Sequence, residues 1–132
     1  MARLYNYLLQ TTPSEYTILY SFDGYDEISL TSDFKLISKR TEQLIQPIEL
    51  GFKTLQQQDI AGGESVAEAA KLFLRVLNGE GTPAQNNVAC INAALAIHCV
   101  YPDKSILDCL AEAQESLQSK KALQVFKQLI NN

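Results

Sequence analysis

Residues 16–29 read YTILYSFDGYDEIS, and they decide both the fold class and the candidate site. Residues 16–20 are rich in β-branched and aromatic side chains without strict alternation, which is typical of a strand buried on both faces. The Asp23-Gly24 dipeptide predicts a turn, and an acidic pair, Asp26 and Glu27, follows it. Ligand sites in α/β proteins lie just beyond the carboxyl ends of strands. The stretch therefore predicts an α/β protein with a candidate site at this pair.

The acidic pair has the chemistry of a magnesium site. Adjacent carboxylates in a tight turn need not point to opposite sides as they would within a strand, so Asp26 and Glu27 can share one Mg²⁺. Protein-bound Mg²⁺ is usually held by one or two carboxylates, several waters and the phosphates of a substrate. Asp23 is either a further ligand or the cap of the turn. An Asp-Glu dipeptide in a turn is ordinarily solvated surface charge, so the flanking sequence decides its meaning.

The segments around this stretch predict a helix and a small meander. Residues 2–11 are predicted to be helical, and residues 28–31, 34–38 and 42–45 to be short strands joined by polar turns. A strand buried on both faces needs neighbouring strands, and this chain offers few. We therefore expect a single domain that is the C-terminal part of a larger α/β catalytic domain, with helix and strands over about 1–50 and helices over 64–131.

From Ser65 onward the apolar period becomes helical. Ser65 and Glu68 form a predicted capping box before the first of four helices, and Thr82-Pro83 opens the second. Residues 83–100 are apolar nearly all round, which indicates a buried central helix. Two further helices are predicted, with a break at Ser119-Lys120. The apolar stripe of the first helix comprises Val66, Ala69, Ala70, Phe73, Val76 and Leu77.

Composition excludes several classes of function. The chain has 132 residues, 46% hydrophobic and 20% charged, with a net charge of −4. It has no Lys/Arg cluster, so nucleic acid is not expected as a partner. No segment predicts a membrane span or a signal peptide. The three cysteines form no CxxC pair, and we expect free thiols in the cytoplasm.

Three other kinds of residue are site candidates by their chemistry. His98 is the only histidine and has no Ser or Cys at hydrogen-bonding spacing, so a structural role is expected. Cys90, Cys99 and Cys109 lie on predicted helices without a nearby base, which argues against nucleophiles. Asn92 lies in the buried helix and must find hydrogen-bond partners, so its hydrogen bonds are expected to fix how this helix packs.

Four segments, in order along the chain, resemble anthranilate phosphoribosyltransferase. Residues 19–29 resemble the strand and metal loop of this family. Residues 62–70 and 76–81 resemble its next helix and a Leu-x-Gly turn. Residues 87–96 are similar to its buried helix with an Asn-Ala-Ala core, and residues 119–122 to its Ser-Gly-Lys-Ala turn. Each match alone is weak evidence, but four matches in the order of the family are specific evidence for the resemblance.

The resemblance implies a fold of the nucleoside phosphorylase and phosphoribosyltransferase type, and a reaction. The family transfers a phosphoribosyl group from phosphoribosyl pyrophosphate (PRPP) to the amine of anthranilate, in tryptophan biosynthesis. By carry-over, Asp26 and Glu27 hold a Mg²⁺ cofactor against the diphosphate, where the ion acts as a Lewis acid. The resemblance also implies a cytoplasmic homodimer as the native enzyme.

The chain also departs from the family. The Gly-Thr-Gly-Gly-Asp loop, the Lys-His-Gly-Asn segment and the anthranilate-contacting arginine are absent. Tyr20 stands where His is common, Tyr25 where Leu is common, and Lys120 replaces the glycine of the late turn. We therefore expect a fragment that is inactive alone.

Two alternatives stay open. A pyrimidine nucleoside phosphorylase-like enzyme shares the architecture implied by the resemblance, but it lacks such an acidic pair. The other alternative is a non-catalytic helical interaction module, which would be indicated by an exposed apolar face.

Overall fold

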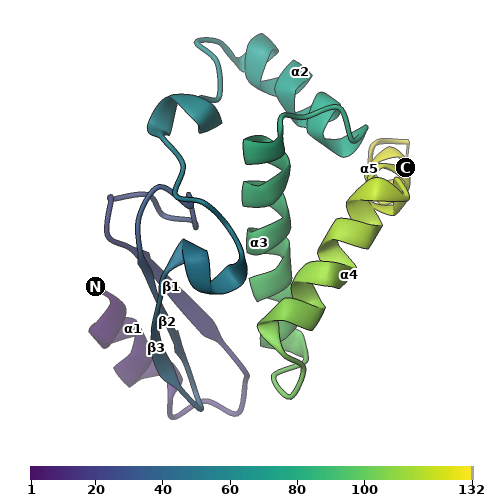
Figure 1. The fold of residues 1–132 in the computed structure, drawn as a ribbon. Coiled ribbons are helices and arrows are strands. Elements are labelled where there is room, and N and C mark those ends of the chain that lie inside the picture. The colour runs from purple at the N-terminus through teal and green to yellow at the C-terminus, as the bar shows by residue number, and fades with distance from the viewer. Residues whose placement is uncertain (132) are drawn as a thin grey trace.

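The structure is a computed structural model that describes residues 1–131. It has a three-stranded sheet followed by a helical half, which confirms the α/β class. In Figure 1 the sheet and α1 lie on one side of α3, and α4 lies on the other. The elements are α1 (Ala2–Leu9), β1 (Thr17–Ser21), β2 (Phe34–Ser38), β3 (Glu42–Ile45), η1 (Pro47–Leu50), η2 (Gln57–Ile60), α2 (Val66–Leu77), α3 (Pro83–Val100), α4 (Ile106–Gln118) and α5 (Lys121–Ile130).

The sheet is antiparallel, with the order β1-β2-β3. Leu36 at its centre faces Leu19 on β1 and Gln43 on β3. β2 and β3 have the predicted bounds, and β1 is shifted by one residue. Within residues 1–131, β1 pairs on one side only and forms an edge of the sheet.

The expectation that the first strand is buried on both faces is wrong. Tyr20 is 50% exposed, and residues 17–19 are only partly buried. Side chains alternate between the faces of a strand, and Leu19 packs against the main core, whereas Tyr20 points to the other face. The short helix α1 lies over that face, where Ile37 is buried but Tyr20 stays half exposed.

The predicted strand at residues 28–31 is also wrong, because this segment is coil. Ile28 and Leu30 are nevertheless fully buried in the core. Their backbone groups bond outside any ladder: Ile28 N donates to the Asn92 side chain, and Leu30 O accepts from Leu55 N at 2.9 Å. Leu30 has φ 61, in the left-handed region, which a strand does not permit. Burial, not strand pairing, explains the alternation seen in the sequence.

The central helix is α3, as predicted, and its bounds agree with the sequence. Thr82 and Gln85 form a reciprocal capping box with Pro83 in the first turn. The core joins one face of the sheet to α3 and α4, and burying each large apolar side chain contributes roughly 1.5–3 kcal/mol. Its α3 members are Cys90, Ile91, Ala94 and Leu95, packed with Phe34, Leu36, Cys109, Leu110 and Ala113.

The other helices form as predicted, except that α1 ends at Leu9 instead of residue 11 and that α2 differs in its cap and its burial. Ser65 caps α2 by accepting from Glu68 N, but the Glu68 carboxylate accepts from Glu64 N instead of Ser65 N, so the capping box is half formed. The stripe of α2 is only partly covered, because Val76 packs against the core whereas Val66 is 88% exposed. The α4–α5 break falls at Lys120, whose φ is 61. Among residues 1–131, no helix is long and apolar enough to cross a membrane.

Candidate functional site

The loop after β1 is organised around Asp23. Its carboxylate accepts hydrogen bonds from Ser21 Oγ (2.7 Å), Ser29 Oγ (2.6 Å), Thr31 Oγ1 and the backbone N of Tyr25 (3.3 Å). Partial burial acts to raise the Asp23 pKa, but these hydrogen bonds outweigh it and hold the pKa well below its ordinary value of 3.8. Asp23 therefore caps the turn, and the alternative of a further metal ligand is not favoured.

The acidic pair differs from Asp23 in having no internal partners. Gly24, with φ 86, turns the chain after the strand. Asp26 and Glu27 are both exposed. Within residues 1–131, neither carboxylate takes part in a hydrogen bond or an ion pair, so both keep their oxygens free for a ligand.

Asn92 of α3 holds the residue that follows the pair. Its Oδ1 accepts from Ile28 N at 3.0 Å, and its Nδ2 donates to Ile28 O at 2.8 Å and to Val88 O at 2.9 Å. Asn92 was expected to fix how the helix packs, and its hydrogen bonds show that it holds the backbone of Ile28, beside the acidic pair. Sequence reasoning missed this partner, because the only signal was an amide in an otherwise apolar helix.

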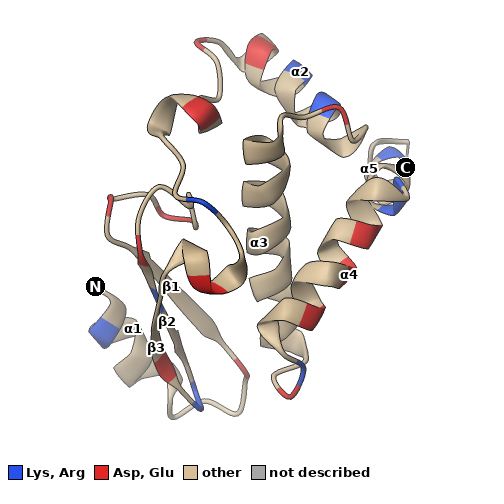
Figure 2. Ribbon diagram, in the orientation of Figure 1, with Lys and Arg blue, Asp and Glu red and all other residues tan. Residues whose placement is uncertain are grey.

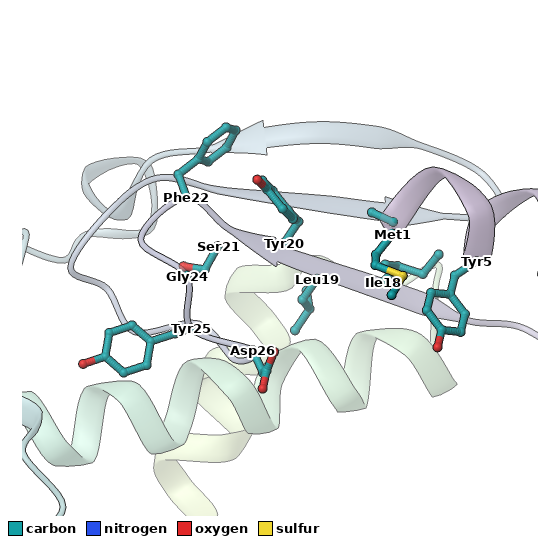
Figure 3. Close-up of a pocket in the computed structure, with 11 residues that line it drawn as sticks. Met1, Tyr5, Ile18, Leu19, Tyr20, Ser21, Phe22, Gly24, Tyr25 and Asp26 are labelled. Atoms are coloured by element: carbon teal, nitrogen blue, oxygen red, sulfur yellow. The ribbon is translucent and has the colours of Figure 1, made fainter.

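A pocket of about 510 Å³ runs along β1 to this loop. In Figure 3, Tyr20 and Phe22 project above β1 and Asp26 lies below it, while α1 closes one end. Asp26 lines the pocket and Glu27 does not. Besides Met1, the lining residues from α1 and β1 are Ala2, Tyr5, Ile18, Leu19, Tyr20 and Ser21. One carboxylate thus faces a space large enough for a small molecule.

The chemistry of this site suits a hard cation with few protein ligands. Among residues 1–131, no group of three or more His, Cys, Asp or Glu side chains is placed to hold a metal ion. A closed protein cage is therefore not formed by these residues. Mg²⁺ requires less, since it keeps several waters and uses one or two carboxylates together with substrate phosphates. The free pair Asp26 and Glu27 fits that requirement.

The other candidate residues lie apart from this loop. His98 Nδ1 is 2.8 Å from the carbonyl oxygen of Lys104, which ties α3 to the turn before α4. Cys90 and Cys109 are buried, and burial raises the pKa of both thiols. A thiol with a raised pKa is a poor nucleophile. Figure 2 shows Lys and Arg distributed over several elements, among them α1, α2 and α5.

Comparison with known proteins defines the class. Residues 1–123 match the model described as glycosyl transferase family, a/b domain. The chain belongs to this glycosyl transferase family through its a/b domain.

The particular relatives are anthranilate phosphoribosyltransferases. The enzyme of Cytophaga hutchinsonii is 42% identical over 130 residues, which are 98% of this chain and 40% of the relative. That of Christiangramia forsetii is 47% identical over 129 residues, covering 98% of this chain and 39% of the relative. The resemblance seen in the sequence is thereby confirmed. The chain spans about two fifths of the length of the curated relatives it matches.

Solved structures agree on the fold. Anthranilate phosphoribosyltransferase from Saccharomyces cerevisiae in complex with PRPP and Mg superposes with a TM-score of 0.74 at 20% identity, over 89% of this chain and 33% of that chain. The enzyme from Thermus thermophilus superposes with a TM-score of 0.75 at 22% identity, over 86% of this chain and 34% of that chain. At these identities the likeness concerns the fold alone.

Proposed function

We propose that this chain supplies the magnesium-holding part of a phosphoribosyl-transfer site, with Asp26 and Glu27 as its metal ligands. The activity of the whole site is transfer of the phosphoribosyl group from PRPP to anthranilate, in tryptophan biosynthesis. The proposal also includes the cytoplasm as location and a homodimer as native assembly, both implied by the resemblance.

One observation carries the metal assignment: one carboxylate of the loop accepts hydrogen bonds from the loop itself, and two have no partner within residues 1–131. Asp23 satisfies the turn through four donors, whereas Asp26 and Glu27 have no partner within residues 1–131. Free adjacent carboxylates repel each other, and a divalent cation relieves that repulsion. A related enzyme of this fold is described in complex with PRPP and Mg, which supports the choice of ion and substrate.

The residues of this chain would perform a limited set of tasks. Asp26 and Glu27 bind the ion, Asp23 and Asn92 hold their loop, and Asp26 faces the pocket along β1. When bound, Mg²⁺ supplies Lewis-acid stabilisation of charge on the departing pyrophosphate. No basic side chain lines this pocket within residues 1–131, so these residues offer hydroxyl donors but no cationic donor to the remaining phosphate oxygens.

Isothermal titration calorimetry tests the metal site. The 132-residue chain is titrated with Mg²⁺ in the presence of PRPP, and the Asp26→Asn/Glu27→Gln double variant is compared with it. Loss of both carboxylates removes the ligands but keeps the shape of the side chains. The affinity for Mg²⁺ should therefore fall by well over about tenfold.

Glu64→Gln/Glu80→Gln is the matched control for this titration. Both glutamates are exposed and lie away from the loop, so the control removes the same net charge without touching the site. It should bind Mg²⁺ like the wild type. Equal affinity in the acidic-pair variant and the wild type refutes the metal assignment.

Turnover is a separate measurement. Formation of phosphoribosyl anthranilate from PRPP and anthranilate is followed by fluorescence. The chain alone should show none, because the Gly-rich phosphate loop and the anthranilate-contacting arginine of the family are absent. Turnover by the isolated chain contradicts this part of the proposal.

A non-catalytic interaction module is the second candidate, and exposed apolar residues favour it. Leu4, Tyr5 and Leu8 on α1 and Tyr20 and Phe22 of the β1 region are all about half exposed, and Tyr5, Tyr20 and Phe22 line the same pocket. Such surface is typical of a binding face. The Mg²⁺ titration separates the two candidates, because an interaction module has no need of a cation at the acidic pair.

A further inference from the structure

The side chain of Asn92 is fully used by three hydrogen bonds. Its oxygen accepts from Ile28 N, and its two N–H groups donate to Ile28 O and Val88 O. The bond to Val88 lies within α3 and orients the amide plane relative to the helix. The reversed amide would bring its oxygen against two carbonyl oxygens, so the hydrogen-bond network selects this orientation.

The bonds to Ile28 constrain the acidic pair directly. Ile28 N belongs to the peptide bond that follows Glu27, and the peptide group is planar. Holding Ile28 N and O therefore holds the plane that begins at the Glu27 α-carbon. On the other side of the pair, Asp23 accepts from Tyr25 N. Asp26 and Glu27 are thus the only two residues between these anchored backbone groups.

The anchor itself is rigid. Asn92 lies between the buried residues Ile91 and Ala94 of the central helix, and Ile28 is fully buried in the same core. The loop is otherwise coil, with its two acidic side chains in solvent. Rigid support for an exposed pair of ligands lowers the entropy lost when a cation binds.

We infer that Asn92 is a positioning residue for the acidic pair, which it orients for a divalent cation through the Ile28 backbone without touching the cation. The metal-binding part of this inference rests on the proposed function, but the anchoring of the loop by Asn92 does not depend on it. Outer partners of metal ligands typically contribute about tenfold or more to metal affinity. Asn92 acts here through the main chain of the neighbouring residue.

The test uses Mn²⁺ as a spectroscopic probe for the Mg²⁺ site. Binding of Mn²⁺ to the 132-residue chain is measured by electron paramagnetic resonance, for the wild type and for Asn92→Asp. The aspartate keeps the size of the side chain and an acceptor for Ile28 N, but it cannot donate to Ile28 O or Val88 O. The Mn²⁺ dissociation constant should rise about tenfold.

Asn86→Ala is the matched control. Asn86 lies on the same helix and donates to Gly81 O at 3.3 Å, away from the loop. It should leave Mn²⁺ binding unchanged. In the Asp26→Asn/Glu27→Gln background, Asn92→Asp should have no further effect on Mn²⁺, because the positioned ligands are gone. A folded Asn92→Asp variant that binds Mn²⁺ like the wild type overturns the inference.

A metal-free measurement separates this inference from the proposed function. Amide hydrogen exchange in the wild type should protect Ile28 N like the core amides of α3, and ¹⁵N relaxation should show a rigid Asp26 and Glu27 backbone. Rapid exchange at Ile28 overturns the positioning role without any variant. If Ile28 is protected but the acidic-pair variant binds Mn²⁺ normally, the metal assignment fails and the anchoring of the loop stands.

Discussion

The side chain of Asn92 bonds to both backbone polar groups of Ile28, across 64 positions of sequence. Through this contact the central helix holds the loop that carries the acidic pair. The loop is held a second time by Asp23, which accepts hydrogen bonds from Ser29 and Thr31. The free carboxylates therefore project from a supported loop, and the separate parts of this arrangement can be tested one at a time.

Asp23→Asn should lower the free energy of unfolding by about 2 kcal/mol at pH 7, because hydrogen bonds to a charged acceptor become bonds to a neutral one. Partial exposure of Asp23 limits the effect through solvent screening. Urea denaturation measures it. Glu27→Gln is the control and should leave stability unchanged, since that carboxylate has no internal partner within residues 1–131.

The Asp23 contribution should also depend on pH. The folded-state pKa lies below the ordinary value of 3.8, so the charged form is favoured by folding. The stabilisation is fully present above that value and is lost as the pH falls through the folded-state pKa. The difference in stability between the wild type and Asp23→Asn should therefore shrink below about pH 4. A difference that stays constant down to acid pH contradicts the role of the charge.

Asp26→Asn/Glu27→Gln should leave the free energy of unfolding within about 0.5 kcal/mol of the wild type, or raise it slightly. Both side chains are exposed and unpartnered within residues 1–131, and the change removes repulsion between neighbouring charges. Chemical denaturation without metal measures this. A large loss of stability would mean that the pair is structural, like Asp23.

Lys120→Gly should stabilise the chain by about 1 kcal/mol, because Lys120 has φ 61, in the left-handed region that costs residues with a Cβ about 1–2 kcal/mol. Its side chain makes no capping bond to α5. Thermal denaturation should show a higher midpoint.

Lys121→Gly is the matched control for that substitution. Lys121 is the first residue of α5, and its Nζ lies 2.9 Å from Glu115 Oε1. Glycine there should lower stability by roughly 0.5–1 kcal/mol. Equal effects of the two substitutions would contradict the conformational explanation.

Val66→Gln should change the free energy of unfolding by less than about 0.5 kcal/mol, because Val66 is 88% exposed. Leu95→Ala, in the core, should cost about 2–5 kcal/mol. Comparing the two by urea denaturation tests whether Val66, at the start of the α2 stripe, belongs to the core. Similar losses would show that it does.

Much of the fold was predictable because it depends on local signals. The caps at Ser65 and Thr82 and the apolar period placed α2 and α3, and short segments between polar turns placed β2 and β3. The strand predicted at residues 28–31 was wrong, because a coil with one side buried shows the same alternation of apolar and polar residues as a strand. The acidic pair was recognised as a candidate, and its use of metal stays a prediction.

The sequence by itself determined the class of protein, the helices and the turn at Gly24, since these follow from neighbouring residues and from similarity along the chain. It left open whether Asp23 was a ligand or a cap, and what Asn92 would contact. Only the tertiary structure decided these points, because each depends on groups that folding brings together: hydroxyls up to eight positions from Asp23, and a backbone segment 64 positions from Asn92. Hydrogen-bond partners are chosen by distance in space, which the order of residues does not state.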